Sequence, residues 1–496
     1  MTTSQFPVLL IAIPLMLVPV AFFVSQAKLS VRGFAIASLG LVAMLAYAPL
    51  VAALGFGLVL PLEARMGGWG PELGIVLMLD PLAALLLPIT NTIIVLGAAI
   101  GFPAGERTPI PYFPLWFLLA AGSNGLIVTS DLFNAYVFLE IIAICSHALV
   151  AYRGDGYAFE SAFKYLIAGL IGSAFILWGI IALFAATGAL SLSVIVDRLP
   201  GAPPALVAAG FSLIVAGICV KLAIVPFHSW KPDGLTGAPP SSAGAISGVV
   251  LSAVLVLMLR VLVGLGGIGG PAQTLSAVSP FPVILTFLGA VSVVVGHSMA
   301  LVQGRLTRML AYSSIGHFGA MLLALALVTP AATAAVVFHG ANHAVLKSGL
   351  FFLCAAAATE RGTDRITGLS GYLARRPLEL AACAILMLAL VGLPPTVGFA
   401  SKWAMIVEVV RAGGIVRALL IGGGSVIAVV YYLRALHTMI WDGAPRQLPD
   451  LGDPRARVTR LALVVGAGYT LVGFVGAGFI FAVASSAVSV LLGGPQ

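Results

Sequence analysis

The feature that most limits how this chain can fold is a succession of apolar stretches, each about 20 residues long and almost free of charge. Only 8% of the 496 residues are charged and 60% are hydrophobic, whereas about 25% of an ordinary soluble protein is charged. The stretches do not alternate between polar and apolar residues, which argues against a membrane β-barrel. The sequence therefore predicts an all-α, polytopic membrane protein.

Fourteen windows have the length and the hydropathy of a membrane-spanning helix. Their approximate extents are 5–25, 33–60, 74–101, 112–129, 131–152, 160–188, 206–228, 240–265, 281–303, 307–329, 331–358, 378–411, 414–438 and 457–491. The first window has no basic residue before Lys28, so it lacks the positive region of a signal peptide. We expect it to be a retained helix.

The basic residues between the windows predict the orientation, because an even number of spans puts both termini on one side. With the amino terminus outside, sixteen basic residues fall in inner connections and five in outer ones. The inner set is Lys28, Arg32, Arg107, Arg153, Lys231, Arg305, Arg308, Arg361, Arg365, Arg375, Arg376, Arg434, Arg446, Arg455, Arg457 and Arg460. The outer set is Arg65, Arg198, Arg260, Arg411 and Arg417. This asymmetry predicts a protein of the cell inner membrane with both termini on the non-cytoplasmic side.

Three lysines, Lys221, Lys347 and Lys402, lie inside apolar windows, whereas Lys164 lies near the inner surface and can reach it. A charged lysine at the bilayer centre costs about 2.5–3.5 kcal/mol, so such residues normally face a polar interior and a partner. Glu140 is the matching carboxylate. Burial disfavours the charged amine and a nearby carboxylate favours it, so a lysine with a movable partner can bind and release a proton. The alternative is a static ion pair that only braces the helices.

One window carries a row of proton-exchanging side chains in the segment FHGANHAVLKSG. His339, His343 and Lys347 are spaced four residues apart, so successive members are offset by about 40° on one helix face. Histidine titrates near neutrality, so this stripe predicts a lateral proton wire. His228 and His317 either extend the wire or only make helix contacts. His147 and His297 are weaker candidates, and His437 is expected to lie at the membrane interface.

The chain is not expected to hold a metal or a cofactor. The His339–His343 pair could bind zinc or haem, but no cysteine or carboxylate accompanies it in the sequence. The cysteines lie singly, at Cys145, Cys219, Cys354 and Cys383, whereas zinc and iron–sulfur sites need grouped thiolates. Nucleic-acid binding is not expected either, because no dense basic block is present.

Prolines interrupt two of the windows that carry lysines. Pro226 follows Lys221, and Pro394 and Pro395 precede Lys402. Proline frees backbone carbonyls inside a membrane helix. Broken helices with a nearby charge are typical of transporter sites, often one in each of two inverted repeats. The order of these residues suits two such halves.

Six segments together resemble a known family: SDLFNAYVFLEIIAICSHALV, FKYLIAGLIGSAF, GICVKLAIVPFHSWKPDG, GRLTRMLAYSSIGHFG, FHGANHAVLKSGLFF and GLPPTVGFASKW. They are similar to the successive signatures of the antiporter-like subunits of respiratory complex I, Mrp cation/proton antiporters and energy-converting hydrogenases. The resemblance implies about fourteen helices with two inverted five-helix repeats, each with a broken helix. The implied division is 1–111 for helices 1–3, 112–265 and 281–438 for the repeats, and 457–496 for helix 14.

The resemblance also implies roles for the buried charges. Glu140 matches the glutamate of the fifth helix, and Lys221 and Lys402 match the lysines of the broken seventh and twelfth helices. His339, His343 and Lys347 match the relay of the eleventh helix. In such a subunit a proton is loaded at the Lys221-type site, passes along a central polar axis and leaves near the Lys402-type site.

Two positions depart from the family pattern. Ser252, in GVVLSAV, occupies the place where the eighth helix usually carries a lysine. In LTGAP, Leu235 and Gly237 stand where histidine and glutamate are common. The central axis thus lacks one titratable group. Either water and Ser252 replace it, or this subunit conducts differently.

The main functional prediction is a D-type subunit of an Mrp-like antiporter that exchanges a monovalent cation such as Na⁺ for protons. The alternative is a proton-pumping membrane-arm subunit of a complex I-like NADH–quinone oxidoreductase or a membrane-bound hydrogenase. A third reading is a haem- or quinone-binding oxidoreductase. In the first two, the expected partners are other integral membrane subunits of the same complex, and any redox chemistry lies in those subunits.

Overall fold

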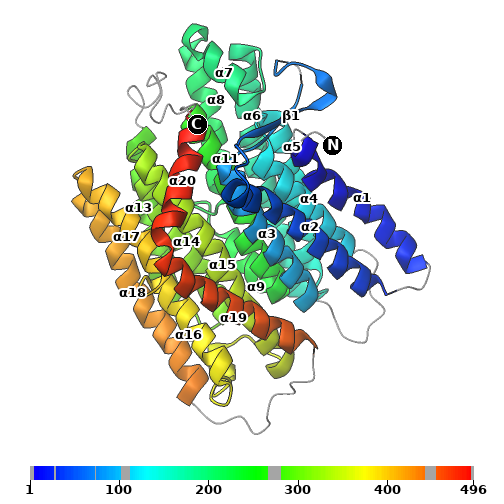
Figure 1. Ribbon diagram of the computed structural model, residues 1–496. Helices are drawn as coiled ribbons and strands as arrows, with labels where there is room; N and C mark the ends of the chain where they lie inside the picture. The colour runs from blue at the N-terminus through cyan, green and yellow to red at the C-terminus, as the bar shows by residue number, and fades with distance from the viewer. Residues whose placement is uncertain are drawn as a thin grey trace.

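The computed structural model describes residues 5–26, 30–72, 74–101, 112–265, 281–441 and 454–492. Almost all of this part is helical, and the helices form one bundle (Figure 1). Three basic residues used to predict the orientation, Lys28, Arg107 and Arg446, lie outside the described residues. Both ends of the described chain lie at one end of the bundle, as an even number of crossings requires (Figure 1).

The first half contains a two-stranded hairpin between its second and third helices. Its helices are α1 (Phe6–Gln26), α2 (Val31–Gly55), α3 (Pro81–Ile100), α4 (Tyr112–Val128), α5 (Leu132–Ala151), α6 (Gly156–Thr187), α7 (Leu192–Arg198), α8 (Pro204–Lys221), α9 (Trp230–Gly237), α10 (Pro240–Ala245) and α11 (Leu251–Gly264). A π-helical turn, η4 (Ile246–Val250), joins α10 to α11 in one continuous rod.

The second half is helical apart from its connections. It contains α13 (Phe281–Leu301), α14 (Leu306–Leu325), α15 (Pro330–Arg361), α16 (Pro377–Val391), α17 (Val397–Arg411), α18 (Ile415–Trp441), α19 (Pro454–Val475) and α20 (Ala477–Leu491). The window predicted over 457–491 is thus two helices that meet at Gly476.

The predicted fold class is confirmed. Within the described residues, eleven helices are long and apolar enough to cross a membrane. Helices α4 and α14 and the α16–α17 pair add three more crossings, so the described chain agrees with the predicted total of fourteen. The division into repeats stays a prediction, although each half contains one broken helix that carries a lysine.

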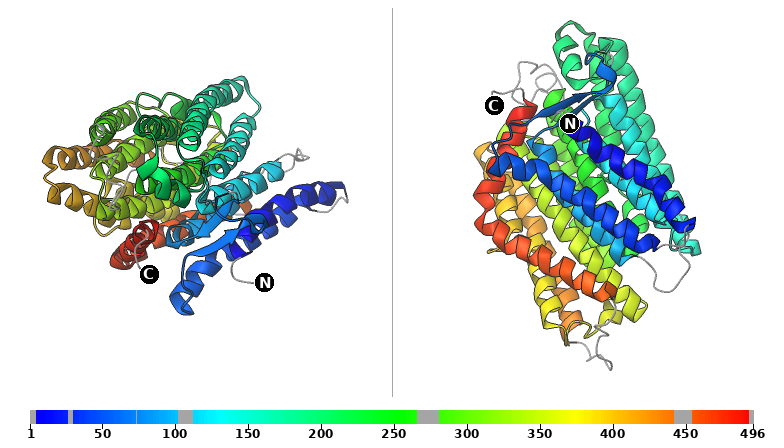
Figure 2. Two further views of the ribbon diagram at one scale, coloured as in Figure 1. Left: turned by 90° about the horizontal axis from the view of Figure 1, so that it is seen from above. Right: turned by 45° about the vertical axis from the view of Figure 1, so that its right-hand side comes forward.

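One predicted boundary is wrong: the window over 74–101 is not helical from its start, because residues 76–79 form a strand and α3 begins at Pro81. Strands β1 (Leu62–Arg65) and β2 (Val76–Leu79) form an antiparallel hairpin at the end of the bundle that holds the termini (Figure 2). The apolar residues of β2 continue directly into the apolar residues of α3, so the sequence predicts a helix that starts too early. However, α3 begins only after Asp80, whose side chain accepts a hydrogen bond from the Ala83 amide at 2.8 Å, with Pro81 at its first position.

Both predicted helix breaks are present. Helix α8 ends at Lys221 because Pro226 has no amide hydrogen and its ring would clash with the carbonyl of Leu222. The second break separates α16 from α17 between 392 and 396. Gly392 has a φ of 89°, and a Cβ there would lie 2.9 Å from the Lys402 side chain, so glycine suits this position.

Among the described residues, two basic residues that were predicted to lie in connections are buried inside helices instead. Lys231 is in α9 and fully buried, because the polar segment WKPDGLTG forms a half-helix inside the bundle rather than a loop. Arg260 is in α11 and also buried. Removing both from the loop counts changes the ratio from sixteen to five into fifteen to four, so the charge asymmetry remains.

The centre of the bundle is formed by α15 and by the α10–α11 rod, which neighbouring helices cover on most sides. Helices α1 and α2 lie along one side of the bundle (Figure 2). Large apolar side chains such as Phe23 and Val426 are exposed on the outer helices α1 and α18, at 70% and 68%. Lipid contact explains this exposure, because such side chains are favoured in hydrocarbon.

Arg260 is buried because it has a buried partner. Its Nη2 lies 2.8 Å from Oδ2 of Asp80 and donates a hydrogen bond of 2.9 Å to the backbone oxygen of Ile127. The pair links α11, α3 and α4 near the end of the bundle. Removing one member of a buried ion pair leaves an uncompensated charge and costs about 3–5 kcal/mol.

We therefore expect Arg260→Met to lower the unfolding free energy of the purified protein by about 3–5 kcal/mol, measured by thermal or denaturant unfolding in detergent. The matched control is Arg65→Met, which breaks the exposed Arg65–Glu63 pair and should change the unfolding free energy by less than about 1 kcal/mol. Equal effects of the two substitutions would contradict a stabilising role for the buried pair.

Candidate functional site

The structure brings the predicted carboxylate and lysine of the first half together. Glu140 on α5 and Lys221 on α8 have an Oε1–Nζ distance of 3.6 Å. The same oxygen accepts a hydrogen bond from the Ser173 hydroxyl on α6. Lys221 is buried, whereas the Glu140 side chain is 27% exposed, so the carboxylate has room to move. Lys221 is also the last residue of its half-helix, where the negative end of the helix dipole favours a cation.

The second broken helix uses the same arrangement. Lys402 lies on α17, and its Nζ donates to the backbone oxygens of Leu390 and Val391 at 2.7 and 2.9 Å. These are carbonyls at the end of α16, which have no partner within their own helix. A third bond of 2.9 Å reaches the Ser425 hydroxyl on α18. Each break thus has a lysine beside it: Lys221 is the last residue of α8, and the Lys402 amine binds the carbonyls at the end of α16.

The stripe on α15 is buried and faces α14 and α17. His339 Nε2 lies 3.1 Å from His317 Nδ1, and its Nδ1 lies 3.0 Å from the hydroxyl of Ser401. The ring centres of His317 and His343 are 5.5 Å apart. Ser401 precedes Lys402 in α17, so the histidine cluster leads directly to the second broken helix. His317 therefore lies within contact distance of the α15 stripe.

Lys347 continues the site by a route that crosses three helices. Its Nζ donates to the Tyr432 hydroxyl on α18 at 3.1 Å. The hydroxyls of Tyr432 and Tyr431 lie 2.8 and 2.9 Å from the Ser313 hydroxyl on α14. The Tyr431 hydroxyl then lies 3.1 Å from Nδ1 of His297 on α13. Hydroxyl and imidazole groups can each donate and accept, so this row is an unbroken path for proton exchange.

Two residues of the predicted set lie outside these contacts. His228 is only half-buried in the break between α8 and α9, and its ring centre is 6.5 Å from that of Tyr312. Ser252 is buried, but its hydroxyl donates to the backbone oxygen of Gly248 in its own helix at 2.7 Å. Neither makes a hydrogen bond to another titratable side chain among the described residues.

The tertiary structure also adds residues that sequence reasoning ranked low or missed. His297 joins the row that starts at Lys347, and His147 lies beside Lys221, because both side chains flank Gly169. Tyr431 and Tyr432 belong to an apolar helix that gives no local signal of their bonds. The sequence does not distinguish a membrane histidine or tyrosine that bonds to another polar side chain from one that does not. Only the packing of the opposing helix shows which of them are bonded.

Half-helix α9 is held by its own acidic residue. The Asp233 carboxylate lies 3.0 Å from Lys164 Nζ on α6 and 2.5 Å from Arg308 Nη1 on α14. Lys164 also pairs with Glu160 at 2.7 Å and is 45% exposed, which suits a lysine that reaches the surface. These pairs fix the position of α9 between the two halves.

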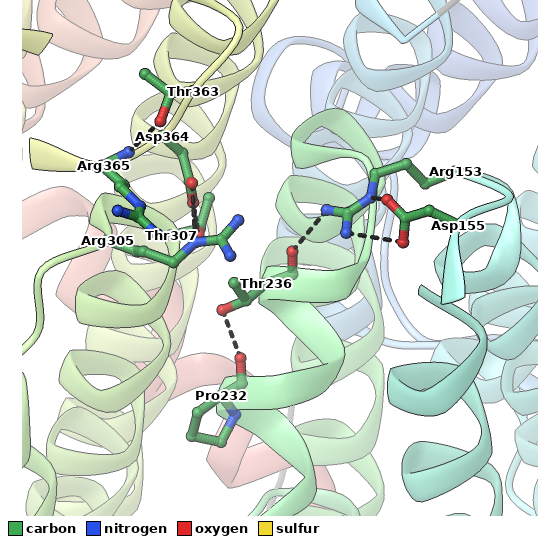
Figure 3. A network of polar contacts seen from close by, with 9 residues as sticks. All are labelled: Arg153, Asp155, Pro232, Thr236, Arg305, Thr307, Thr363, Asp364 and Arg365. Carbon is green, nitrogen blue, oxygen red and sulfur yellow. Dashed lines mark hydrogen bonds and ion pairs between the residues drawn. The ribbon is translucent and has the colours of Figure 1, made fainter. Parts of the chain in front are cut away.

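A second polar cluster fixes the carboxyl end of α9 (Figure 3). Arg153 donates to both oxygens of Asp155, at 2.6 and 3.0 Å, and to the backbone oxygen of Thr236 at 3.2 Å. The bonds from Arg153 hold the pKa of the Asp155 carboxyl below its ordinary value. On the facing side, Arg305 donates to Asp364 at 2.9 Å. The loops after α5 and α15 thus close around the end of α9.

In the described part of the chain, no group of three or more histidine, cysteine, aspartate or glutamate side chains is arranged to hold a metal ion. The four cysteines are buried and unbridged. Nearly every group of the site is an amine, an imidazole, a hydroxyl or a single carboxylate. Such a set exchanges protons, whereas a hard cation such as Na⁺ prefers several oxygen ligands.

Comparison with known proteins gives one family. The model of the family described as NADH:quinone oxidoreductase/Mrp antiporter, TM, matches residues 129–428. NADH-quinone oxidoreductase subunit N of Desulforudis audaxviator (strain MP104C) is 33% identical over 459 residues, which cover 90% of this chain and 88% of that protein.

Two solved structures have the same fold over almost the whole chain. A chain of the membrane-bound sulfane sulfur reductase, an archaeal respiratory membrane complex, is 30% identical, with a TM-score of 0.87 and 98% of both chains covered. A chain of the Mrp complex from Dietzia sp. DQ12-45-1b has a TM-score of 0.88 and covers 99% of this chain and 98% of its own length. Its identity of 22% shows a shared fold.

We expect Tyr432→Phe to lower the unfolding free energy by about 1–3 kcal/mol, because the buried amine of Lys347 loses one of its two acceptors. The measurement is thermal or denaturant unfolding of the purified protein. Tyr47→Phe is the control, since it removes an exposed hydroxyl that bonds only to Thr92 in the described chain, and it should have little effect. No difference between the two variants would contradict the bond network.

Proposed function

Because the chain belongs to the NADH:quinone oxidoreductase/Mrp antiporter family of membrane subunits, we propose that it carries protons through Glu140, Lys221, His343, Lys347 and Lys402. The observation that carries this proposal is the set of titratable groups that lie at the two broken helices and between them. The Glu140–Lys221 pair stands at one broken helix, Lys402 stands at the other, and the histidines of α14 and α15 lie between them.

We further propose that the complex is a respiratory one. Identity is higher to subunit N of NADH-quinone oxidoreductase and to the sulfane sulfur reductase chain than to the Mrp chain. This favours the alternative from the sequence, a complex I-like membrane arm, over the D-type Mrp subunit that was the main prediction. In such an arm, electron transfer in other subunits would drive proton movement in this one.

The geometry supports a switching step at Lys221. A carboxylate 3.6 Å from the amine favours the ammonium form, and withdrawal of Glu140 would leave a buried cation without its counter-charge. The amine would then release its proton toward the centre. At the far end, the three acceptors of Lys402 stabilise its ammonium form until the proton leaves.

The orientation is part of the same proposal. Arg153 and Arg305 belong to the larger, inner set of basic residues predicted from the sequence, so we assign the end of the bundle where they lie to the cytoplasmic side. The termini then face away from the cytoplasm. Protons would enter the site from the side on which the α9 cluster lies.

We expect Lys221→Arg to reduce proton translocation about 100-fold, almost as far as Lys221→Ala, because arginine keeps the charge but does not release a proton. Glu140→Gln should reduce proton translocation by a similar factor. The measurement is proton uptake by liposomes that contain the purified complex, with electron transfer recorded in parallel. Retention of transport by the arginine variant would instead identify Lys221 as a fixed brace for Glu140.

The subunits that purify with this chain test which type of complex it belongs to. We expect iron–sulfur proteins, together with flavin or nickel proteins, to purify with an affinity-tagged form of this chain from its native membrane. Recovery of small membrane subunits alone, with Na⁺/H⁺ exchange in liposomes, would support the Mrp-type antiporter instead. Haem absorbance in the purified single chain would contradict both assignments.

A further inference from the structure

Lys231 differs from the other buried lysines of the described chain. Lys347 and Lys402 donate to oxygen acceptors, and Lys221 faces Glu140. The Lys231 side chain is 0% exposed, yet its Nζ has no hydrogen-bond partner among the described residues. Its nearest compensation is the ring of Phe318 on α14, whose centre lies 4.8 Å away. An amine in this state destabilises the fold, so its presence needs a functional reason.

The position of Lys231 supplies that reason. The Phe318 ring that contacts its amine also contacts the ring of His343, with 5.1 Å between centres. Lys231 is close enough to interact electrostatically with both His343 and Lys347. It therefore stands beside the α15 stripe, separated from it by one aromatic ring.

On its other side, Lys231 is connected to the first half. The preceding residue, Trp230, stacks on Tyr165 with 4.2 Å between ring centres and donates to the backbone oxygen of Val220, next to Lys221. Tyr165 in turn contacts His147, which lies beside Lys221. Half-helix α9 thus spans the interval between Lys221 and the α15 stripe.

Apart from Lys231, contacts among the described residues place Tyr165 and His147 in this interval, and both lie on its Lys221 side. Ser252 lies on the buried α11 and donates to its own helix. Asp233 on α9 is committed to Lys164 and Arg308. Those two ion pairs hold the backbone of α9, so the flexible four-carbon side chain of Lys231 can move while its anchor stays fixed.

We propose that Lys231 is the proton-carrying link between Lys221 and the His343–Lys347 stripe, and that Phe318 is the barrier between its amine and His343. The inference rests on the proposed proton transport and adds a residue to its path. In this path the Lys231 amine accepts a proton from the Lys221 side, through water that enters the break, and releases it to His343 once the ring moves aside. Only N–H bonds of the side chains and O–H bonds of the relaying water are made and broken.

The test uses Lys231→Met and Lys231→Arg in the complete complex, reconstituted in liposomes. Both variants should lose proton translocation about 100-fold, since methionine cannot carry a proton and arginine cannot release one. Lys231→Met should also keep or raise the melting temperature, because it removes an unpartnered buried charge. Arg411→Met, which removes an exposed cation from the end of α17, is the matched control and should leave translocation unchanged.

Three results would overturn the inference. Normal translocation by Lys231→Met would show that the group is not on the path. Normal translocation by Lys231→Arg with loss in Lys231→Met would show that a fixed charge suffices. Lost translocation with a clearly lower melting temperature in Lys231→Met would assign a structural role.

The Glu140→Gln variant separates this inference from the proposed function. If Glu140→Gln loses translocation and Lys231→Met does not, only the role of Lys231 fails. If neither variant loses translocation, the proposed path fails as a whole. The Phe318→Ala variant adds an independent measure: removal of the barrier should raise passive proton leak through the reconstituted protein, and this rise should disappear in Phe318→Ala/Lys231→Met.

Discussion

The structure depends on one constraint: a charged amine inside hydrocarbon must find its compensation within the protein. Helix ends supply much of it. Lys402 donates to the final carbonyls of α16, and Lys221 is the last residue of α8, where the dipole of the half-helix favours a cation. The prolines that break these helices therefore create the two lysine sites as well as interrupting the chain.

The same constraint explains why the site lies across the bundle. Side-chain compensation comes from neighbouring helices: Glu140 on α5 faces Lys221, and Tyr432 and Ser425 on α18 accept from Lys347 and Lys402. A row of such contacts runs laterally, from one helix to the next, rather than along one helix. Helix α15 is central because its buried stripe faces both the α14 histidine and the second broken helix. The bundle thus separates a lipid-facing apolar exterior from a connected polar interior.

Buried charges in this protein fall into two kinds. The Asp80–Arg260 pair, at 2.8 Å and almost unexposed, joins three helices and leaves no route for exchange, which is typical of a brace. The Glu140–Lys221 pair is longer, at 3.6 Å, and its carboxylate is partly exposed, which allows the partners to separate. Distance and exposure together therefore separate structural ion pairs from those suited to proton exchange. Composition cannot make this distinction, because both kinds look like isolated charges in apolar sequence.

The sequence by itself determined the fold class, the fourteen crossings, both helix breaks and the residues Glu140, Lys221, His339, His343, Lys347 and Lys402 as a candidate set. Hydropathy, proline chemistry and the penalty for buried charge are local properties, so they can be read along the chain. The tertiary structure alone decided that Lys231 is buried, that Tyr431 and Tyr432 join the row from Lys347, and that β1 and β2 form a hairpin. A short polar half-helix resembles a loop, and a tyrosine resembles any other core residue, until a distant segment packs against it and supplies the missing partner or leaves it without one.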